Sequence, residues 1–175
     1  MALETYIFKT NIEEAEKKAY EIVKTRNRAL EQAYKDPTSG LVFLTEDKMD
    51  YMDELNPDIS WLRFNHITGW VSEKLFENPK DNLDINLCIA CIEDLKNLRN
   101  DCRKVIDHCT MPDGSIKVDK KYCRKIFPSL DLPFSGNQEY DNVFIEEIKK
   151  AKQDIDILLL SSWQPDTLFV IYADY

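Results

Sequence analysis

Two segments at opposite ends of the chain limit the fold more than any other feature of the sequence. Residues 2–9 (Ala-Leu-Glu-Thr-Tyr-Ile-Phe-Lys) alternate in side-chain type, and residues 167–172 (Thr-Leu-Phe-Val-Ile-Tyr) are β-branched or aromatic at almost every position. Both compositions are typical of strands. We predict that the two segments pair as an antiparallel sheet at one side of the helices between them.

Between these segments, apolar residues recur at three- and four-residue steps, the spacing of amphipathic helices. The expected helices run from a Thr10–Glu13 capping box to about Lys35, from Asn56-Pro57 through Trp70, from residue 82 or 84 to about Cys109, and from Asp141 to residue 160. A short strand is expected at residues 41–44. Residues 1–175 are therefore predicted to form one α+β domain, mostly α, with four to five helices packed together and a small antiparallel sheet formed by the N- and C-terminal strands.

The five cysteines are an odd number, and most lie on expected helix faces rather than in short disulfide-framing loops, which predicts reduced thiols. Cys88 and Cys91 form a C-x-x-C pair that we place inside the central helix and interpret as buried structural thiols, with a metal or redox site as the alternative. No run of the sequence approaches the roughly 20 apolar residues of a membrane span, and the N-terminus does not resemble a signal peptide. We expect a cytosolic protein that does not bind membranes.

The net charge of −9 is unevenly distributed. Residues 37–58 and 129–175 are rich in acidic side chains, whereas residues 101–128 have an excess of lysine and arginine. Most of such a surface would repel a phosphate backbone, so direct nucleic-acid binding is not expected. Solvated lysines, an anion site and a contact for an acidic patch of a second copy are three interpretations of the basic residues. These residues are Lys117, Lys120, Lys121, Arg124 and Lys125.

Residues 46–58 form an acidic segment in which Met49, Met52 and Leu55 are spaced for one helical face. A solvated helix or loop is one interpretation. A surface that docks on a basic partner is the other, and the spacing of the carboxylates does not match a calcium-binding loop. The acidic residues of this partner surface would be Glu46, Asp47, Asp50, Asp53 and Glu54.

Residues 61–70 contain two of the three tryptophans and one of the two histidines. We interpret Trp61 and Trp70 as packing residues because each must bury a large apolar area, and a ligand-binding pair is the alternative. His66 has no metal-ligating residue three or four positions away, so no metal site is expected there. On a helix the apolar stripe would be Phe64, Ile67, Val71 and Leu75, with Asn65, His66, Gly69 and Ser72 mostly on the opposite side.

Several motifs occur in order along the chain: the start Met1–Ile7, then Trp61, Asn65, Ile67 and Trp70, then Gly136–Asp141, and an aromatic close at Phe169–Tyr175. Together they resemble a widespread group of uncharacterised bacteriophage and prophage proteins. That group begins Met-Gly-Leu-Asp-Met-Tyr-Leu, has a central Trp-Arg-Lys-Ala-Asn-x-Ile-His-x-Trp-Phe helix and carries Gly-Ser-Thr-Glu-Tyr-Asp late in the chain. The resemblance implies a fold and a bacterial host cytoplasm, but no activity. This chain departs from the pattern at Leu62 and Thr68, where the group has Arg and His.

The polar residues available for a site come from two parts of the chain, the tryptophan-containing helix and the segment before the last helix. For the two carboxylates of that segment, capping of the helix start is the alternative role. No nucleophile with a base, glycine-rich phosphate loop or zinc spacing is apparent, so neither an enzyme nor a cofactor is expected. The candidate ligand- or partner-binding residues are Trp61, Arg63, Asn65, Trp70, Glu139, Tyr140 and Asp141.

Three hypotheses for function follow. The first is an acidic phage or prophage protein that inhibits a host or defence factor by stoichiometric contact, as an anti-CRISPR or anti-restriction protein would. The second is a protein that sequesters a small nucleotide signal, with an aromatic ring stacked on the base and basic residues on the phosphate. The third is a structural or regulatory subunit without catalysis, and homo-oligomerisation is open in each case.

Overall fold

The computed structural model describes residues 3–35, 52–76, 86–131, 136–162 and 164–174. These residues contain five α-helices, a short 3-10 helix (Asp53–Leu55) and a four-stranded antiparallel sheet, which confirms the predicted α+β class. The strands are β1 (Glu4–Asn11), β2 (Ile59–Leu62), β3 (Asn86–Cys91) and β4 (Thr167–Asp174), and the helices are α1 (Ala15–Lys35), α3 (Asn65–Lys74), α4 (Ile92–Cys109), α5 (Lys120–Ile126) and α6 (Asn142–Leu160).

The pairing of the two chain ends is confirmed. β1 and β4 are the central strands of the order β2-β1-β4-β3, and they pair antiparallel from Glu4 opposite Asp174 to Asn11 opposite Thr167. Because side chains alternate along a strand, each strand contributes to two separate cores. Tyr6, Phe8, Val170 and Tyr172 pack with Ile22 and Met52 on one face, and Ile7, Phe169, Ile171 and Ala173 join the larger core on the other.

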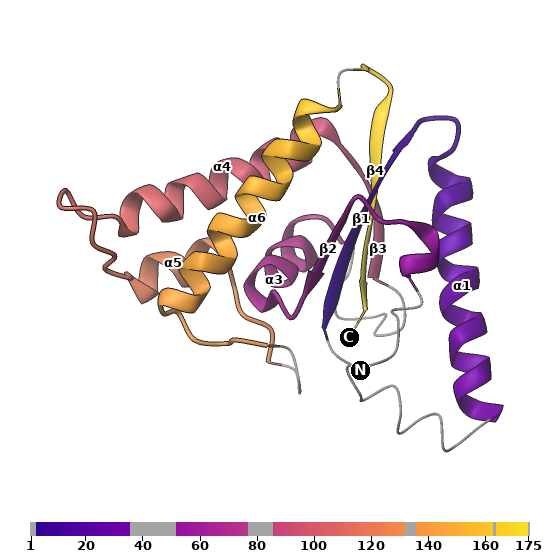
Figure 1. The fold of residues 1–175 in the computed structure, drawn as a ribbon, viewed down its shortest axis with the longest axis horizontal. Helices are drawn as coiled ribbons and strands as arrows, with labels where there is room; N and C mark the ends of the chain where they lie inside the picture. The colour runs from indigo at the N-terminus through magenta and orange to yellow at the C-terminus, as the bar shows by residue number, and fades with distance from the viewer. Residues whose placement is uncertain (1–2, 36–51, 77–85, 132–135, 163, 175) are drawn as a thin grey trace.

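Figure 1 shows the resulting layers. α1 covers one face of the sheet, while α3, α4, α5 and α6 lie on the other side, with α4 packed along α6. The predicted apolar seams of these two long helices are confirmed: Leu95, Leu98, Cys102, Val105 and Cys109 of α4 and Phe144, Ile148, Ala151, Ile155 and Leu158 of α6 are buried. None of the described helices is long and apolar enough to span a membrane.

The start of the first helix differs from the prediction. β1 continues through Thr10 and Asn11, which pair with β4, so Thr10 is not available as a helix cap. α1 begins only at Ala15, after a turn at residues 12–14 in which the Asn11 side-chain oxygen accepts a hydrogen bond from the backbone N–H of Glu14 at 3.0 Å. Asn side chains commonly close such turns.

The helix expected from Asn56-Pro57 is wrong over its first half. Residues 59–62 form β2 instead, and Trp61 lies opposite Thr5 of β1. Asn56 and Arg63, on either side of this strand, have positive φ angles of 51° and 59°, which a continuous helix cannot contain. α3 begins only at Asn65 and is buried on every side from Asn65 to Ser72, so the polar side opposite the apolar stripe is buried as well.

The central helix is likewise shorter than predicted. Residues 86–91, including Leu87 and both cysteines of the C-x-x-C pair, form the edge strand β3, and α4 begins at Ile92. Side chains three positions apart on a strand point to opposite faces, so Cys88 and Cys91 are poorly placed to bind one metal ion. Cys91 is exposed and Cys88 is half-buried, which corrects the interpretation of both as buried thiols.

This difference in burial predicts selective thiol labelling. Burial raises the pKa of Cys123 and of Cys88 to about 12, and Cys102 and Cys109 are also buried. Since the thiolate is the reactive form, iodoacetamide should label Cys91 of the native protein first, while denaturant should expose all five cysteines. Peptide mass spectrometry over a time course measures this, and rapid native labelling of Cys102, Cys109 or Cys123 would contradict the packing of α4 against α5.

Candidate functional site

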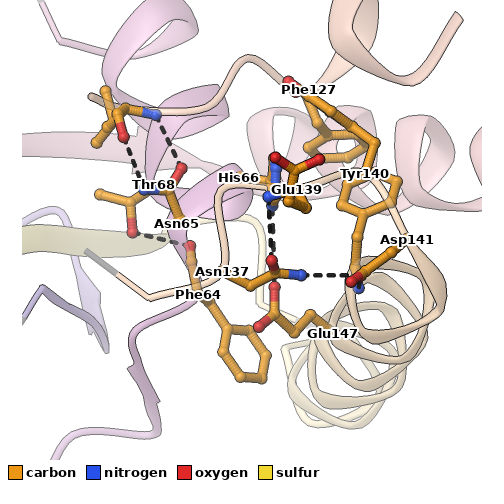
Figure 2. Close-up of polar contacts among 12 residues, drawn as sticks. Phe64, Asn65, His66, Thr68, Phe127, Asn137, Glu139, Tyr140, Asp141 and Glu147 are labelled. Atoms are coloured by element: carbon orange, nitrogen blue, oxygen red, sulfur yellow. Dashed lines mark hydrogen bonds and ion pairs between the residues drawn. The ribbon is translucent and has the colours of Figure 1, made fainter. Parts of the chain in front are cut away.

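Four of the seven sequence-predicted site residues, Asn65, Glu139, Tyr140 and Asp141, lie where the start of α3 is beside residues 136–141 and the first turns of α6 (Figure 2). Gly136 has a φ of +89°, and a Cβ atom at this position would lie 2.1 Å from the carbonyl oxygen of Arg63. Only glycine permits this approach. The two chain segments that were expected to contribute to one site are therefore in contact.

Both polar atoms of the Asn65 side chain form hydrogen bonds within the protein. Its side-chain nitrogen donates a hydrogen bond to the carbonyl oxygen of Leu130 at 2.9 Å, and its side-chain oxygen accepts one from the N–H of Leu130 at 2.8 Å. The residue is 0% exposed. An amide side chain can donate and accept at the same time. Asn65 uses both hydrogen bonds to hold the segment that follows α5 against α3.

The segment before α6 has a mixture of buried and exposed side chains. Tyr140 is buried, and its hydroxyl donates a hydrogen bond to the carbonyl oxygen of Phe127 at 2.8 Å. Asp141 is the N-cap of α6 and accepts a hydrogen bond from the N–H of Phe144 at 3.0 Å, so the capping interpretation applies to it. Glu139 is exposed and lies 3.3 Å from the Lys120 ammonium.

The capping role of Asp141 predicts a pH dependence. The N–H of Phe144, followed by the side chain of Asn137, holds the pKa of Asp141 below its ordinary value of 3.8. A lowered folded-state pKa stabilises the fold above the ordinary value, and this contribution is lost as the pH falls through the folded-state pKa. Asp141→Ala should lower the free energy of unfolding by about 1 kcal/mol at pH 7, and the difference from wild type should narrow below about pH 4.

Chemical denaturation of both proteins between pH 7 and pH 2.5 measures this change, and Asp141→Asn is the matched control. Asparagine keeps a side-chain oxygen for the N–H of Phe144 but has no charge to titrate. Its stability relative to Asp141→Ala should therefore stay nearly constant with pH. A constant difference between wild type and Asp141→Ala over the whole range would contradict the lowered pKa.

His66 is the least expected member of this region. Its ring is enclosed by Tyr140 and Phe144, with centroid distances of 4.6 and 4.7 Å, and its Nδ1 lies 3.9 Å from Oε2 of Glu147 (Figure 2). Within the described residues, neither ring nitrogen has a hydrogen-bond partner, and neither does that oxygen of Glu147. Sequence spacing could not find this pair, because Glu147 comes from α6 and His66 from α3.

Thr68 takes the position at which the phage group has His. Its hydroxyl lies 2.6 Å from the hydroxyl of Thr5 and also donates to the carbonyl oxygen of Phe64 at 3.2 Å. Leu62, at the Arg position of that group, is an exposed residue of the edge strand β2. Neither position carries an ionisable side chain here. Among the residues that the structure describes, no three His, Cys, Asp or Glu side chains are grouped to hold a metal ion.

The two tryptophans are anchors between elements. Trp61 donates its indole N–H to Asp154 of α6 at 2.9 Å, and Trp70 donates to Asp101 of α4 at 3.0 Å. Each is only 2% exposed. A buried Trp normally finds such a partner for its one polar atom. Neither ring face is open for stacking on a ligand, so the packing interpretation describes both residues.

A groove between α3 and α4 has a volume of about 530 Å³. Trp70 reaches its floor, and Asn97, Asn100, Asp94 and Asp101 contribute polar side chains. Three cations, Lys74, Arg103 and Lys104, also line it. Lys104 lies 2.7 Å from Asp101, which raises the pKa of that lysine. The groove is therefore lined by side chains of both charges.

The second hollow, of about 450 Å³, is lined by Lys120, Lys121, Arg124 and Lys125. We call it the α5 surface. All four residues are exposed, and the Arg124 guanidinium lies 5.4 Å from the centre of the Tyr140 ring. The predicted basic patch is thus a concentrated positive surface on one short helix.

An acidic surface lies where β1 turns into α1 and α6 turns into β4, at one end of the molecule (Figure 1). We call it the acidic end. The backbone N–H of Ile12 donates to the carbonyl oxygen of Asp166 at 3.2 Å, which joins the two turns. Ile12 itself is 64% exposed. The exposed acidic residues of the acidic end are Glu13, Glu14, Glu16 and Asp166.

Of the acidic partner surface predicted from the sequence, only Asp53 and Glu54 belong to the described residues. Glu46, Asp47 and Asp50 are outside the described residues, and Asp53 begins the short 3-10 helix. Glu54 is exposed and pairs with Arg28 of α1. Sequence reasoning missed the acidic end because its members come from residues 13–16 and 166, which only the pairing of β1 with β4 brings together.

Comparison with known proteins adds no assignment: no protein-family model matches the chain, and neither a curated protein nor a solved structure is detectably similar to it.

Proposed function

We propose that this chain is a phage- or prophage-encoded acidic binding protein that inhibits a host or defence factor by stoichiometric contact through its acidic end. The observation that carries the proposal is the composition of that end: three exposed glutamates follow the exposed Ile12 within one helical turn of sequence, and the exposed Asp166 is joined to Ile12 through the backbone. Carboxylates steer a partner of opposite charge, and a projecting apolar side chain provides contact area once the partner is bound.

The kind of partner follows from this chemistry. A basic groove that normally holds a phosphate backbone presents fixed positive charges, and the spaced carboxylates of Glu13, Glu14 and Glu16 could occupy such charges in place of phosphates. A nuclease of a defence system, of the kind that anti-CRISPR or anti-restriction proteins inhibit, has such a groove. Occupying the groove requires no catalysis by the inhibitor.

The hydrogen bonds of the buried candidate residues favour recognition of a partner at the surface rather than at an internal site. Trp61, Asn65, Trp70 and Tyr140 were candidate ligand-binding residues, and each directs its polar atoms to a partner within the fold. Releasing any of them would leave buried polar groups unsatisfied, which costs about 1–3 kcal/mol each. The exposed residues are therefore the better candidates for recognition.

Capture from a bacterial host lysate tests the proposal. Immobilised protein should retain a basic partner at about 50 mM salt and release most of it at about 500 mM, because exposed charge pairs are screened. The eluted partner should lose its nucleic-acid-dependent activity when one equivalent of the protein is added. Recovery of no partner at either salt concentration, or full activity of the captured partner at a molar excess of the protein, would reject the proposal.

A second candidate function is sequestration of a nucleotide signal, which the α3–α4 groove favours. Its volume is within the usual range for small-molecule sites, and Lys74, Arg103 and Lys104 could bind phosphate. A thermal-shift screen with cyclic and adenine nucleotides tests this, since a ligand at 100 times its dissociation constant adds about 2.7 kcal/mol of stability. A response abolished by Arg103→Ala would support the groove, and no response to any nucleotide would reject it.

A further inference from the structure

We propose that the acidic end of one copy of this protein binds the α5 surface of a second copy, so that the chain assembles head to tail. The inference goes beyond the proposed function because it concerns the protein alone. It rests on two surfaces of opposite charge on the same molecule, one with a hollow and the other with an exposed isoleucine.

The α5 surface has positive charge that the fold does not neutralise. The ammonium groups of Lys121 and Lys125, one helical turn apart, have no hydrogen bond or ion pair within the described part of the chain; Lys121 uses only its backbone N–H, which donates to Asp119. Lys120 pairs only with Glu139, and the two side chains are 62% and 75% exposed. An ion pair so exposed contributes about 1 kcal/mol or less, so another carboxylate can replace Glu139 readily.

The shape of the α5 surface also matters. The hollow of about 450 Å³ is walled by four long basic side chains, whose aliphatic stems form apolar walls below the charged groups. Arg124 is held above the Tyr140 ring, and Tyr140 is itself fixed to Phe127. One side of the hollow is therefore ordered before any partner binds, which lowers the entropy cost of binding.

The acidic end combines an exposed apolar side chain with carboxylates. Ile12 projects from the turn, with Glu13 and Glu14 following it and Asp166 beside it. The turn is held by hydrogen bonds from the N–H of Ile12 to Asp166 at 3.2 Å and from the N–H of Glu14 to the Asn11 side chain at 3.0 Å. An isoleucine flanked by carboxylates fits a hollow with apolar walls and a basic rim. Lys17, also exposed, lies at the edge of the acidic end and sets its limit.

The position of the two surfaces determines the kind of assembly. In Figure 1 the acidic end lies at the top of the view, where β1 meets α1, and α5 lies at the lower left. The contact joins two different surfaces, so it is heterologous and leaves a free surface at each end of a dimer. The net charge of −9 makes copies repel one another, whereas a contact that places carboxylates on the α5 surface gains electrostatic energy. Open chains that shorten with salt are expected.

Sedimentation velocity with purified protein tests the inference. At about 50 mM salt the average mass should rise above that of a monomer with increasing concentration, and at about 500 mM it should return to the monomer value. E13Q/E14Q and K121Q/K125Q should each weaken self-association on the order of tenfold or more, because each removes two charges from one of the two surfaces. The control E93Q/E146Q, which removes two exposed charges from α4 and α6, should associate like wild type.

Mixing distinguishes this contact from a symmetric one. The E13Q/E14Q variant keeps a native α5 surface and the K121Q/K125Q variant keeps a native acidic end, so an equimolar mixture should form one contact and stop at a dimer. Unchanged self-association of either variant, or a mixture that stays monomeric, would overturn the inference. So would a wild-type protein that is monomeric at low salt. Because no host factor is present, such a result would leave the proposed function untouched, whereas failure of lysate capture would leave this inference untouched.

Discussion

Replacing Gly69 with alanine should lower the free energy of unfolding by about 3 kcal/mol or more. A Cβ atom at position 69 would lie 2.0 Å from the carbonyl oxygen of Pro128, far inside van der Waals contact. Pro128 cannot easily move away, because hydrogen bonds hold the residues on either side of it. Phe127 accepts one from Tyr140, and the N–H and carbonyl oxygen of Leu130 both bond to Asn65. Urea denaturation of the two proteins measures the change.

Gly114→Ala is the matched control for this substitution. Gly114 has a φ of +82°, so alanine there is strained, but no atom lies within 4 Å of the added Cβ. Its cost should be only about 1 kcal/mol. Equal destabilisation by the two substitutions would mean that α3 does not pack closely on the Pro128 segment, and the account of residues 61–70 as a packing centre would be wrong.

Replacing Asn65 with alanine should cost about 3 kcal/mol. The substitution removes two hydrogen bonds to Leu130 and leaves a small cavity at a position that is 0% exposed. Thermal or chemical unfolding measures the loss, and near-UV circular dichroism reports whether Trp61 and Trp70 keep their native environments. A change within about 0.5 kcal/mol would show that the Asn65 amide does not hold the chain after α5.

Asn65→Asp separates the two hydrogen bonds. At neutral pH aspartate still accepts from the N–H of Leu130 but places a second acceptor, with a buried charge, against the Leu130 carbonyl oxygen. This variant should be less stable than Asn65→Ala at pH 7 and should regain stability toward pH 4, where the protonated acid can donate. Equal stability at both pH values would contradict the arrangement.

The strands at the chain ends and the seams of the long helices could be predicted because their patterns are local. Alternation in residues 2–9 and the three- and four-residue spacing of α4 and α6 each describe how one element divides core from solvent. β2 and β3 were missed for a physical reason. Trp61, Phe64 and Ile67 have helical spacing, yet Ile59 and Trp61 also alternate with Ser60 and Leu62, and pairing with β1 selects the strand.

The candidate site was predicted in part. The contact between the start of α3 and residues 136–141 was expected, and Gly136 against Arg63 is the feature that makes it. Sequence patterns could not predict the hydrogen-bond partner of each side chain, because the partners Leu130, Asp154 and Asp101 are distant along the chain. The acidic end was missed for the same reason.

The central claim, that a host partner binds the acidic end, is tested most directly by calorimetry of the partner captured from lysate. At about 100 mM salt, E13K/E14K/E16K should weaken binding about a hundredfold, because three attractive contacts become repulsive. The matched control E73K/E93K/E146K reverses three exposed carboxylates on other surfaces and should bind within about threefold of wild type. Equal affinity of the E13K/E14K/E16K variant and wild type, or equal losses in both variants, would contradict the claim.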